Sequence, residues 1–330
     1  MNKNNKQKVV LINDTTYDNH YGCDAVIKTI RQLVKKYNGV ITSSVPFYIN
    51  WEKSQYIQNK IKLSDIVIVN GEGSLHSGNM EWLVTVAEFA KKYNSKVFLI
   101  NSIYQNNPDS YKKYLRLFDM ITVRESLSQK ELNKIGIAST VVPDLSFYIH
   151  KKPHAIKSTK KVYFSDSTVD SASKELATLK DFSEEIHIRY HQFIRVNFGI
   201  SLANLIKSNA LMNLKNLVWL KRRGRLILKN EKKFIEKINS SKIIITGRFH
   251  LICLAIKHQK AFVPYKTNTH KIKGLLIDVF GKSKTPMEID KNSIDKIEKN
   301  YAFKNQKLMK KYTTEANKKI EELFREMLQQ

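Results

Sequence analysis

The sequence predicts an α/β protein of two domains, each built on a parallel sheet. The chain has 330 residues, and a domain usually holds roughly 100–200 residues, which favours two domains. Short apolar runs alternate with longer periodic segments, as is typical of parallel sheets that are covered by helices on both faces. The polar stretch from Lys151 to His154, which contains Pro153, interrupts this alternation, which then restarts.

The first half of the chain contains short runs that we expect to be buried strands. They are rich in β-branched residues and are bounded by polar turns. These runs are Val9–Ile12, Val40–Thr42, Ile66–Val69, Val97–Ile100 and Met120–Val123, with a short last strand at Val141–Val142. The periodic segments between them predict helices at Ala25–Tyr37, Met80–Tyr93 and Ser126–Ile135.

The second half repeats the pattern on a smaller scale. We expect strands at Val162–Phe164, Ile186–Ile188, Ile243–Ile245 and Phe262–Val263. The stretch Tyr301–Gln330 lacks Gly and Pro and predicts one long helix. We therefore expect an N-terminal domain over residues 1–155, a C-terminal domain over 156–290 and a helical segment over 291–330.

The composition favours an anionic partner. The chain has 57 Lys and Arg against 30 Asp and Glu, a formal net charge of +27. Nucleic acid, anionic lipid, a phosphorylated substrate and an acidic polysaccharide are all candidates, and codon bias is the alternative explanation. No apolar stretch reaches the roughly 20 residues of a membrane-spanning helix, and the polar N-terminus argues against a signal peptide, so we expect a cytoplasmic protein.

Metal chemistry has no clear signature in this sequence. The two cysteines, Cys23 and Cys253, lie far apart and have no CxxC neighbour, which argues against a zinc ribbon or a redox pair. No cluster of metal-ligating residues is visible, so we expect no metal.

Polar loops follow two of the predicted strands in the first domain. The loop Asn13–Asp24 leads to a helix N-terminus, which suits a sugar or a phosphate, although Asp24 also fits a simple helix cap. In the next loop Glu72 stands between Gly71 and Gly73, where a carboxylate is a reasonable general base. The alternative is a tight turn with a solvated Glu72. The spacing matches neither a dinucleotide-binding motif nor a P-loop.

Three further strand ends carry basic residues. Arg124 follows a strand, where it can bind a carboxylate or phosphate, or else form a surface cluster with Glu125. Arg248 and His250 stand between the run Ile243–Ile245 and an apolar helix, so both can converge on one anion. A structural histidine is the alternative for His250. The loop after the last predicted strand supplies amide, imidazole and ammonium groups to the same edge, from Asn268, His270 and Lys271.

Six segments, taken together and in this order, resemble the polysaccharide pyruvyl transferase family. The resemblance covers about residues 9–280. The segments are Asn19–Val26, Gly71–Leu75, Val123–Ser126, Val142–Asp144, Arg248–His250 and Asn268–Ile272. It implies a GT-B-like fold, in which two Rossmann-like domains with parallel sheets face a central cleft. It also implies a transferase that moves a pyruvyl group from phosphoenolpyruvate, the donor substrate, to sugar hydroxyls of a surface-glycan precursor, without a cofactor.

The resemblance assigns roles to residues of this chain. The implied catalytic residues are His250, Arg248, Glu72 and Asp24. The implied donor-binding residues are Arg124, Arg248, His250, Asn268, His270 and Lys271. The implied acceptor-binding residues are Asn19, Gly71, Gly73, Ser74 and His76.

Two alternatives to this function remain open in the sequence. A glycosyltransferase that uses a nucleotide sugar in capsule or lipopolysaccharide synthesis would need the same basic cleft. A nucleic-acid-binding protein is favoured by net charge alone, and no recognised module supports it, so we expect no nucleic acid partner.

A basic segment lies within the second domain. The stretch Lys207–Lys233 predicts a basic amphipathic helix that suits an anionic membrane surface, which would place the protein peripherally at the inner membrane face. A helix between domains with a solvated basic face is the alternative. In either case the expected acceptor is a glycan or a lipid-linked sugar.

Overall fold

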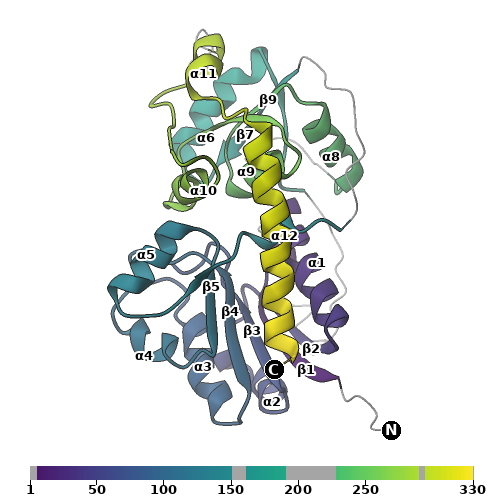
Figure 1. Cartoon of the computed structure of the whole chain (residues 1–330), viewed down its shortest axis with the longest axis vertical. Coiled ribbons are helices and arrows are strands. Elements are labelled where there is room, and N and C mark those ends of the chain that lie inside the picture. Colours follow the sequence, from purple (N-terminus) through teal and green to yellow (C-terminus); the bar gives the residue numbers. More distant parts are fainter. Residues whose placement is uncertain (1–5, 151–160, 191–227, 290–293, 330) are drawn as a thin grey trace.

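The computed structural model describes residues 6–150, 161–190, 228–289 and 294–329. Two α/β domains lie one above the other, and one long C-terminal helix runs beside both of them (Figure 1). This arrangement confirms the predicted α/β class with two sets of parallel strands and a C-terminal helix.

The first domain contains a six-stranded parallel sheet in the order β2-β1-β3-β4-β5-β6. Its strands are β1 (Gln7–Asp14), β2 (Gly39–Pro46), β3 (Ile66–Asn70), β4 (Lys96–Ser102), β5 (Met120–Val123) and β6 (Thr140–Val141). Each contains or overlaps a strand predicted from the sequence.

Helices cover both faces of this sheet. They are α1 (Tyr21–Lys36), α2 (Gln55–Lys62), α3 (Trp82–Lys91), α4 (Tyr111–Leu115) and α5 (Ser126–Lys134), with 3-10 turns η1 (Thr15–Asp18), η2 (Trp51–Lys53) and η3 (Leu145–Phe147). Val9 and Leu11 of β1 pack in the core beside α1, whereas Val10 and Ile12 pack in the core of the opposite face. Successive side chains of a strand point to opposite faces, which explains the uninterrupted apolar runs.

The second domain contains a four-stranded parallel sheet in the order β10-β9-β7-β8. Its strands are β7 (Val162–Ser167), β8 (Glu184–Glu185), β9 (Ile243–Gly247) and β10 (Ala261–Pro264). Its helices are α6 (Asp170–Ala177), α8 (Glu231–Ser240), α9 (Phe249–Lys257), α10 (Lys271–Phe280) and α11 (Ile294–Tyr301), with the 3-10 turn η4 (Thr178–Asp181).

The predicted strand Ile186–Ile188 is wrong. The strand at this place is the two-residue β8, and Ile186 and Ile188 follow it as buried irregular chain. The carbonyl of Ile188 accepts a hydrogen bond from the backbone of Tyr21 in the first domain. The apolar residues at this site are buried against the other domain, which produces a strand-like pattern without a strand.

The long C-terminal helix, α12 (Gln306–Gln329), begins later than predicted, because Tyr301 ends the separate helix α11. Its apolar face is buried in the core that also contains side chains of α1 and α9. Near its end, Glu321 accepts hydrogen bonds from Lys36, Tyr37 and Tyr148 of the first domain. The segment predicted as a third unit therefore packs against both domains.

In each sheet the strand order reverses at one point. Ligands of open α/β sheets bind at such points, just beyond the carboxyl ends of the strands. In the first sheet this point lies between β1 and β3, and in the second it lies between β7 and β9. These two places define where a site is expected.

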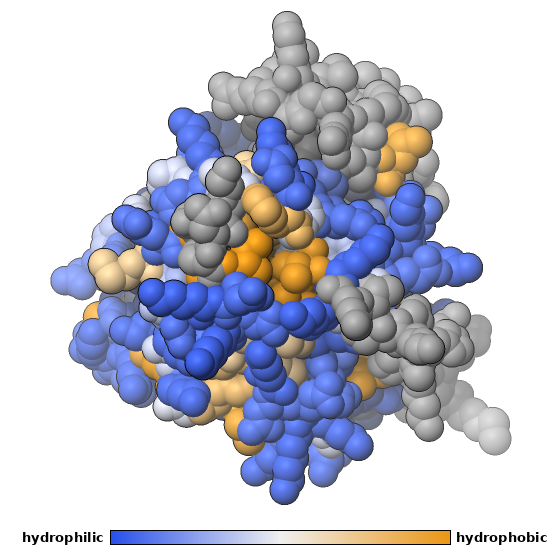
Figure 2. All heavy atoms as spheres, turned by 90° about the horizontal axis from the view of Figure 1, so that it is seen from above, coloured by the Kyte–Doolittle hydropathy of each residue, from blue (hydrophilic) through white to orange (hydrophobic). Residues whose placement is uncertain are grey.

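The predicted basic helix Lys207–Lys233 lies mostly outside the described residues. In the described part, Asn230 caps the start of α8 at Glu231, so the chain is not helical just before that residue. Among the described residues, we find no helix with the length and hydrophobicity needed to cross a membrane. Figure 2, a view onto the upper end of Figure 1, shows hydrophilic side chains around a smaller hydrophobic area.

Candidate active site

A cavity of about 230 Å³ lies at the carboxyl ends of both sheets. Loops after β1, β3 and β5 of the first domain line it together with loops after β7 and β9 of the second. Its lining residues are Thr15, Asp18, His20, Cys23, Phe47, Glu72, Gly73, Ser74, Arg124, Thr168, Arg189, Arg248, Phe249, His250 and Lys271. The cavity therefore lies at both points where the strand order reverses.

The cavity is built to bind an anion. Three helices begin at its wall: α1 with His20 as N-cap, α9 with Arg248 as N-cap, and α10 at Lys271. Helix N-termini carry partial positive charge, which favours anionic ligands. The cations Arg124, Arg189, Arg248 and Lys271 line the same space.

Four charged side chains form a buried network on one wall. Nη1 of Arg124 lies 3.0 Å from a carboxylate oxygen of Asp144 and 3.3 Å from one of Glu72. Nε2 of His250 lies 3.5 Å and 3.4 Å from oxygens of the same two carboxylates. The guanidinium of Arg124 also stacks 4.2 Å over the ring of Phe249, and Arg124 is only 2% exposed. This network holds Arg124 and His250 in fixed orientations.

The network sets the protonation of its members. Burial opposes the charge on His250, but Asp144 and Glu72 raise the pKa of His250 well above its usual value. Burial alone would raise the pKa of Asp144, but His250 and Arg124 hold the pKa of that carboxyl below its usual range. His250 is therefore protonated near neutral pH and is suited to donate a proton.

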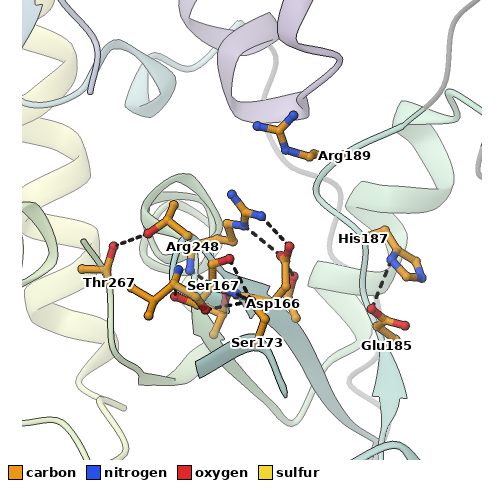
Figure 3. Close-up of polar contacts among 12 residues, drawn as sticks. Asp166, Ser167, Ser173, Glu185, His187, Arg189, Arg248 and Thr267 are labelled. Carbon is orange, nitrogen blue, oxygen red and sulfur yellow. Dashed lines mark hydrogen bonds and ion pairs between the residues drawn. The ribbon is translucent and has the colours of Figure 1, made fainter. Parts of the chain in front are cut away.

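Arg248 is held by a partner that the sequence did not reveal. Its Nε donates a 2.8 Å hydrogen bond to Asp166 of β7, and its Nη2 donates to the second oxygen of the same carboxylate. Figure 3 shows the two side chains facing each other in this two-point pair. Such bidentate pairs fix the plane of the guanidinium, so the remaining donors of Arg248 have a defined direction.

Lys271 is the cation whose charge depends most on its surroundings. Burial, Arg124 and Arg248 lower the pKa of Lys271 to about 7, and Glu72 only partly opposes them. Its Nζ donates a 2.9 Å hydrogen bond to Asn268. An anion bound between these groups would stabilise the charged form of Lys271.

Asp18 and Arg189 join the two domains beside the cavity. Nη1 and Nη2 of Arg189 each donate a 2.9 Å hydrogen bond to one oxygen of Asp18. His20 and Arg189 also form an antiparallel backbone bridge. The wall of the cavity is therefore continuous across the domain boundary.

The structure brings together seven of the predicted site residues at the cavity wall. They are Glu72, Gly73, Ser74, Arg124, Arg248, His250 and Lys271. The other predicted residues, which are Asp24, Asn19, Gly71, His76, Asn268 and His270, are not in that wall.

Most of these other residues support the wall from behind. The backbone carbonyl of Asn19 accepts a hydrogen bond from the backbone amide of Tyr190, and Oδ1 of Asn268 accepts one from Nζ of Lys271. A side chain on Gly71 would lie 2.4 Å from Ser102, so this glycine is required for close packing. His270 lies against Ser128 of α5, and His76 forms a backbone bridge with Gln105.

Asp24 was predicted as a candidate base, and the structure argues against that role. Its carboxylate accepts a 2.6 Å hydrogen bond from the hydroxyl of Tyr190 and lies 2.9 Å from Nζ of Lys229. It is not among the residues that line the cavity. We therefore assign Asp24 a structural role.

Sequence reasoning missed several residues that shape the cavity. Asp144 ends the segment Val142–Asp144, whose pattern assigns it no task, and Asp166 stands two residues after the apolar run Val162–Phe164 of β7. His20 and Asp18 lie in the polar loop after β1, from which the prediction names Asn19 and Asp24 instead. Arg189 follows the segment that was mistaken for a strand, which concealed its position at the domain boundary.

Among the residues that the structure describes, two groups of side chains are close enough to hold a metal ion. They are His20, Cys23 and His250, and Glu72, Asp144 and His250. Burial raises the pKa of Cys23 to about 12, whereas metal binding requires a thiolate. In the second group the carboxylates are already paired with Arg124 and His250. These donors thus serve hydrogen bonding and ion pairing, and the expectation of no metal stays a prediction.

The fold and the cavity define an enzyme of the GT-B type, in which two parallel-sheet domains bind substrates between them. The chain belongs to the polysaccharide pyruvyl transferase family, whose family model matches residues 20–269. It is therefore a member of a transferase family. No curated protein matches the sequence.

Solved structures are similar to this chain at low identity. A UDP-GlcNAc 2-epimerase from Methanocaldococcus jannaschii is 11% identical, with a TM-score of 0.50, covering 93% of this chain and 98% of that one. An uncharacterized protein from Klebsiella pneumoniae is 14% identical, with a TM-score of 0.49, covering 86% of this chain and 92% of that one. A UDP-GlcNAc 2-epimerase from Neisseria meningitidis, bound to UDP-GlcNAc, is 12% identical, with a TM-score of 0.47, covering 95% and 94%.

Proposed function

We propose that this enzyme transfers a pyruvyl group from phosphoenolpyruvate to two hydroxyls of a sugar in a surface-glycan precursor. The observation that carries the proposal is the small cavity in which Arg124, Arg248, Lys271 and a protonated His250 meet three helix N-termini. Phosphoenolpyruvate carries a carboxylate and a phosphate, and both groups suit these donors.

The size of the cavity also favours a small donor. Pockets for drug-sized ligands usually hold roughly 300–1,000 Å³. The described residues enclose about 230 Å³, which suits a compact dianion better than a nucleotide sugar. A glycosyltransferase with a nucleotide-sugar donor is therefore the weaker candidate.

The side chains suggest a division of labour. Glu72 takes the proton of the first sugar hydroxyl, whose oxygen bonds to the central carbon of phosphoenolpyruvate, while His250 protonates the methylene carbon, which becomes a methyl group. The bond between the central carbon and the phosphate oxygen then breaks, and the phosphate leaves with the electron pair of that bond. The second hydroxyl then adds to the central carbon and closes the ketal. Of the two hydroxyl protons, one restores His250 and the other leaves with the phosphate.

Donor binding prepares Glu72 for this task. In the free enzyme Arg124 and His250 lie 3.3 and 3.4 Å from its carboxylate and form ion pairs with it. The anionic donor offers these cations a second partner, so its arrival weakens their hold on Glu72. The acceptor is a glycan or lipid-linked sugar.

The experiment follows the two donors in parallel. Purified enzyme is incubated with candidate glycan acceptors and with either phosphoenolpyruvate or a nucleotide sugar, and released phosphate and nucleotide are measured. Acceptor-dependent phosphate release with a mass gain equal to one pyruvyl ketal supports the proposal. Nucleotide release without any reaction of phosphoenolpyruvate would instead support the glycosyltransferase.

Peripheral membrane association is proposed on charge alone. Each basic residue near an anionic bilayer contributes on the order of 1 kcal/mol, and Lys207–Lys233 is rich in them. Lipid-linked acceptors would make such a location useful. Co-sedimentation with anionic and neutral vesicles at low and high salt tests this, and equal binding to both vesicle types would contradict it.

A further inference from the structure

His20 is a buried side chain of the cavity wall to which the proposed mechanism assigns no task. It is 5% exposed and serves as N-cap of α1. Its ring lies edge to face with that of His250, with centroids 5.2 Å apart. Two histidines thus share the cavity, and their surroundings differ.

The first turn of α1 fixes the tautomer of His20. Its Nδ1 accepts hydrogen bonds from the backbone amides of Gly22, at 3.1 Å, and Cys23, at 3.4 Å. A proton on Nδ1 would point at these two N–H groups, so Nδ1 carries a lone pair and the proton of the neutral ring lies on Nε2. Among the described residues, none accepts a hydrogen bond from that Nε2–H group.

The charges around His20 keep its ring neutral. The charged and titratable groups near it are His250, Arg189, Arg248, Lys271 and Cys23. Burial, followed by His250 and the three other cations, lowers the pKa of His20 well below its usual value. His250 differs, because Asp144 and Glu72 raise its pKa. One histidine of the pair is therefore a neutral donor and the other is a cation.

We propose that His20 is a neutral hydrogen-bond donor of the active site, whose Nε2–H group binds an anionic oxygen, of phosphate or carboxylate, on the bound donor substrate. The geometry supports this because Nδ1 is turned toward α1, which leaves the opposite edge of the ring to line the cavity. The backbone bridge to Arg189 holds the residue in place. A neutral imidazole at a helix N-terminus can stabilise charge without donating its proton.

The proposal rests on the proposed function only for the identity of the substrate. Its chemical part is tested without turnover, by ¹⁵N NMR of histidine-labelled protein between pH 5.5 and 8.5, with the His20→Asn variant for assignment. We expect His20 to remain the neutral Nε2–H tautomer throughout this range. Titration near its ordinary pKa of about 6.5, or a proton on Nδ1, would overturn the proposal.

Two ligands distinguish the source of the anionic oxygen. Inorganic phosphate and pyruvate are each titrated into the labelled protein, and the Nε2–H signal of His20 is followed. A shift with phosphate alone assigns the contact to the phosphate group, and a shift with pyruvate alone assigns it to the carboxylate. If the signal shifts with none of the three compounds, which are phosphate, pyruvate and phosphoenolpyruvate, anion binding by His20 is overturned.

Substitutions distinguish the role of His20 as a helix cap from its role as a hydrogen-bond donor. Asn is a favoured N-cap, so His20→Asn retains an acceptor for the amides of α1 but loses the distant N–H group. We expect its melting temperature to stay near that of the wild type while its Kd for phosphoenolpyruvate rises roughly tenfold to hundredfold. His258→Asn is the matched control, since His258 contacts the Asn239 side chain at the other end of α9.

The outcomes distinguish this proposal from the proposed function. Wild-type affinity of His20→Asn for both phosphate and phosphoenolpyruvate would overturn the role of His20 and leave pyruvyl transfer untouched. If the wild type does not turn over phosphoenolpyruvate but the tautomer and the phosphate response are as expected, the proposed function fails and the donor role of His20 stands.

Discussion

The two domains present different chemistry to the same cavity. The first domain contributes Thr15, Asp18 and Glu72 from the ends of β1 and β3, together with Arg124 from β5. The second contributes the basic side chains of Arg189, Arg248, His250 and Lys271. Under the proposed function, most of the cations that bind the donor come from the second domain, joined by Arg124 of the first, and Glu72 of the first domain serves the acceptor hydroxyls.

The acidic side chains of the first domain do not oppose this arrangement. Glu72 and Asp144 are neutralised by Arg124 and His250, so they organise the cations rather than repel the donor. The second domain supplies the larger share of the cations that line the cavity, although Arg248 is itself paired with Asp166 and Arg189 with Asp18. Substitutions on the two sides should affect different kinetic constants.

The largest effect is expected on the side of the second domain, for His250→Gln. This variant lacks the acidic proton, so we expect kcat to fall by about 10²–10⁴-fold with the fold retained. Steady-state kinetics with phosphoenolpyruvate and circular dichroism measure the two quantities. His258→Gln changes a histidine at the far end of α9 and should keep wild-type turnover. Full activity of His250→Gln would place the acid elsewhere.

Arg248→Ala should reduce kcat/KM by about a hundredfold or more, because it removes a cation aimed at the donor and the two-point pair with Asp166. Arg248→Lys should recover only part of the loss, since an ammonium group cannot form the two-point pair. Kinetics at varied phosphoenolpyruvate concentration measure the effect. Arg116→Ala, at an exposed arginine of the first domain, is the control. Equal losses in both alanine variants would point to a general charge effect.

On the side of the first domain, Glu72→Gln should reduce kcat by roughly tenfold to hundredfold and change the Kd of phosphoenolpyruvate much less. The reason is that Glu72 is assigned to the acceptor proton. Turnover kinetics and calorimetric donor binding separate the two effects. Asp24→Asn is the matched control, because Asp24 is bound to Tyr190 and Lys229 outside the cavity. A change in donor affinity alone would make Glu72 a binding residue.

Gly22→Ala tests the contact between the two halves. A Cβ at this position would lie 2.3 Å from Cβ of His250, so α1 or α9 must shift. We expect a loss of about 1–3 kcal/mol in the free energy of unfolding, as for other overpacked sites, and about a tenfold loss of kcat. Chemical denaturation and kinetics measure both. Gly73→Ala, whose nearest neighbour is Nη2 of Arg124 at 3.3 Å, should leave stability nearly unchanged.

The smallest effect concerns pH. Because the pKa of Lys271 is lowered to about 7, this side chain loses its proton in the free enzyme as pH rises above 7. Donor affinity should therefore fall by several-fold between about pH 7 and 8.5, as binding then requires uptake of a proton. Calorimetry across this range measures it. Lys271→Met should bind more weakly but without this pH dependence, whereas exposed Lys266→Met should behave as the wild type.

The sequence revealed those site residues that directly follow an apolar run. Arg124 and Arg248 each come immediately after a strand, and a parallel sheet brings such positions to one edge. Their partners were not visible, because Asp144 and Asp166 become meaningful only when strands distant in sequence are side by side. The chain between Tyr301 and Gln306 lacks Gly and Pro, so nothing in the local pattern marked the break between α11 and α12.

The course of α12 also bears on how the chain folds during synthesis. The first domain precedes the second, yet Lys36 and Tyr37 at the end of α1 complete their hydrogen bonds only with Glu321 of α12. Leu328 of this helix lies close to Gly39 at the start of β2. One apolar face of the first domain therefore stays uncovered until the whole second domain has left the ribosome, and during that interval it is a natural binding site for chaperones.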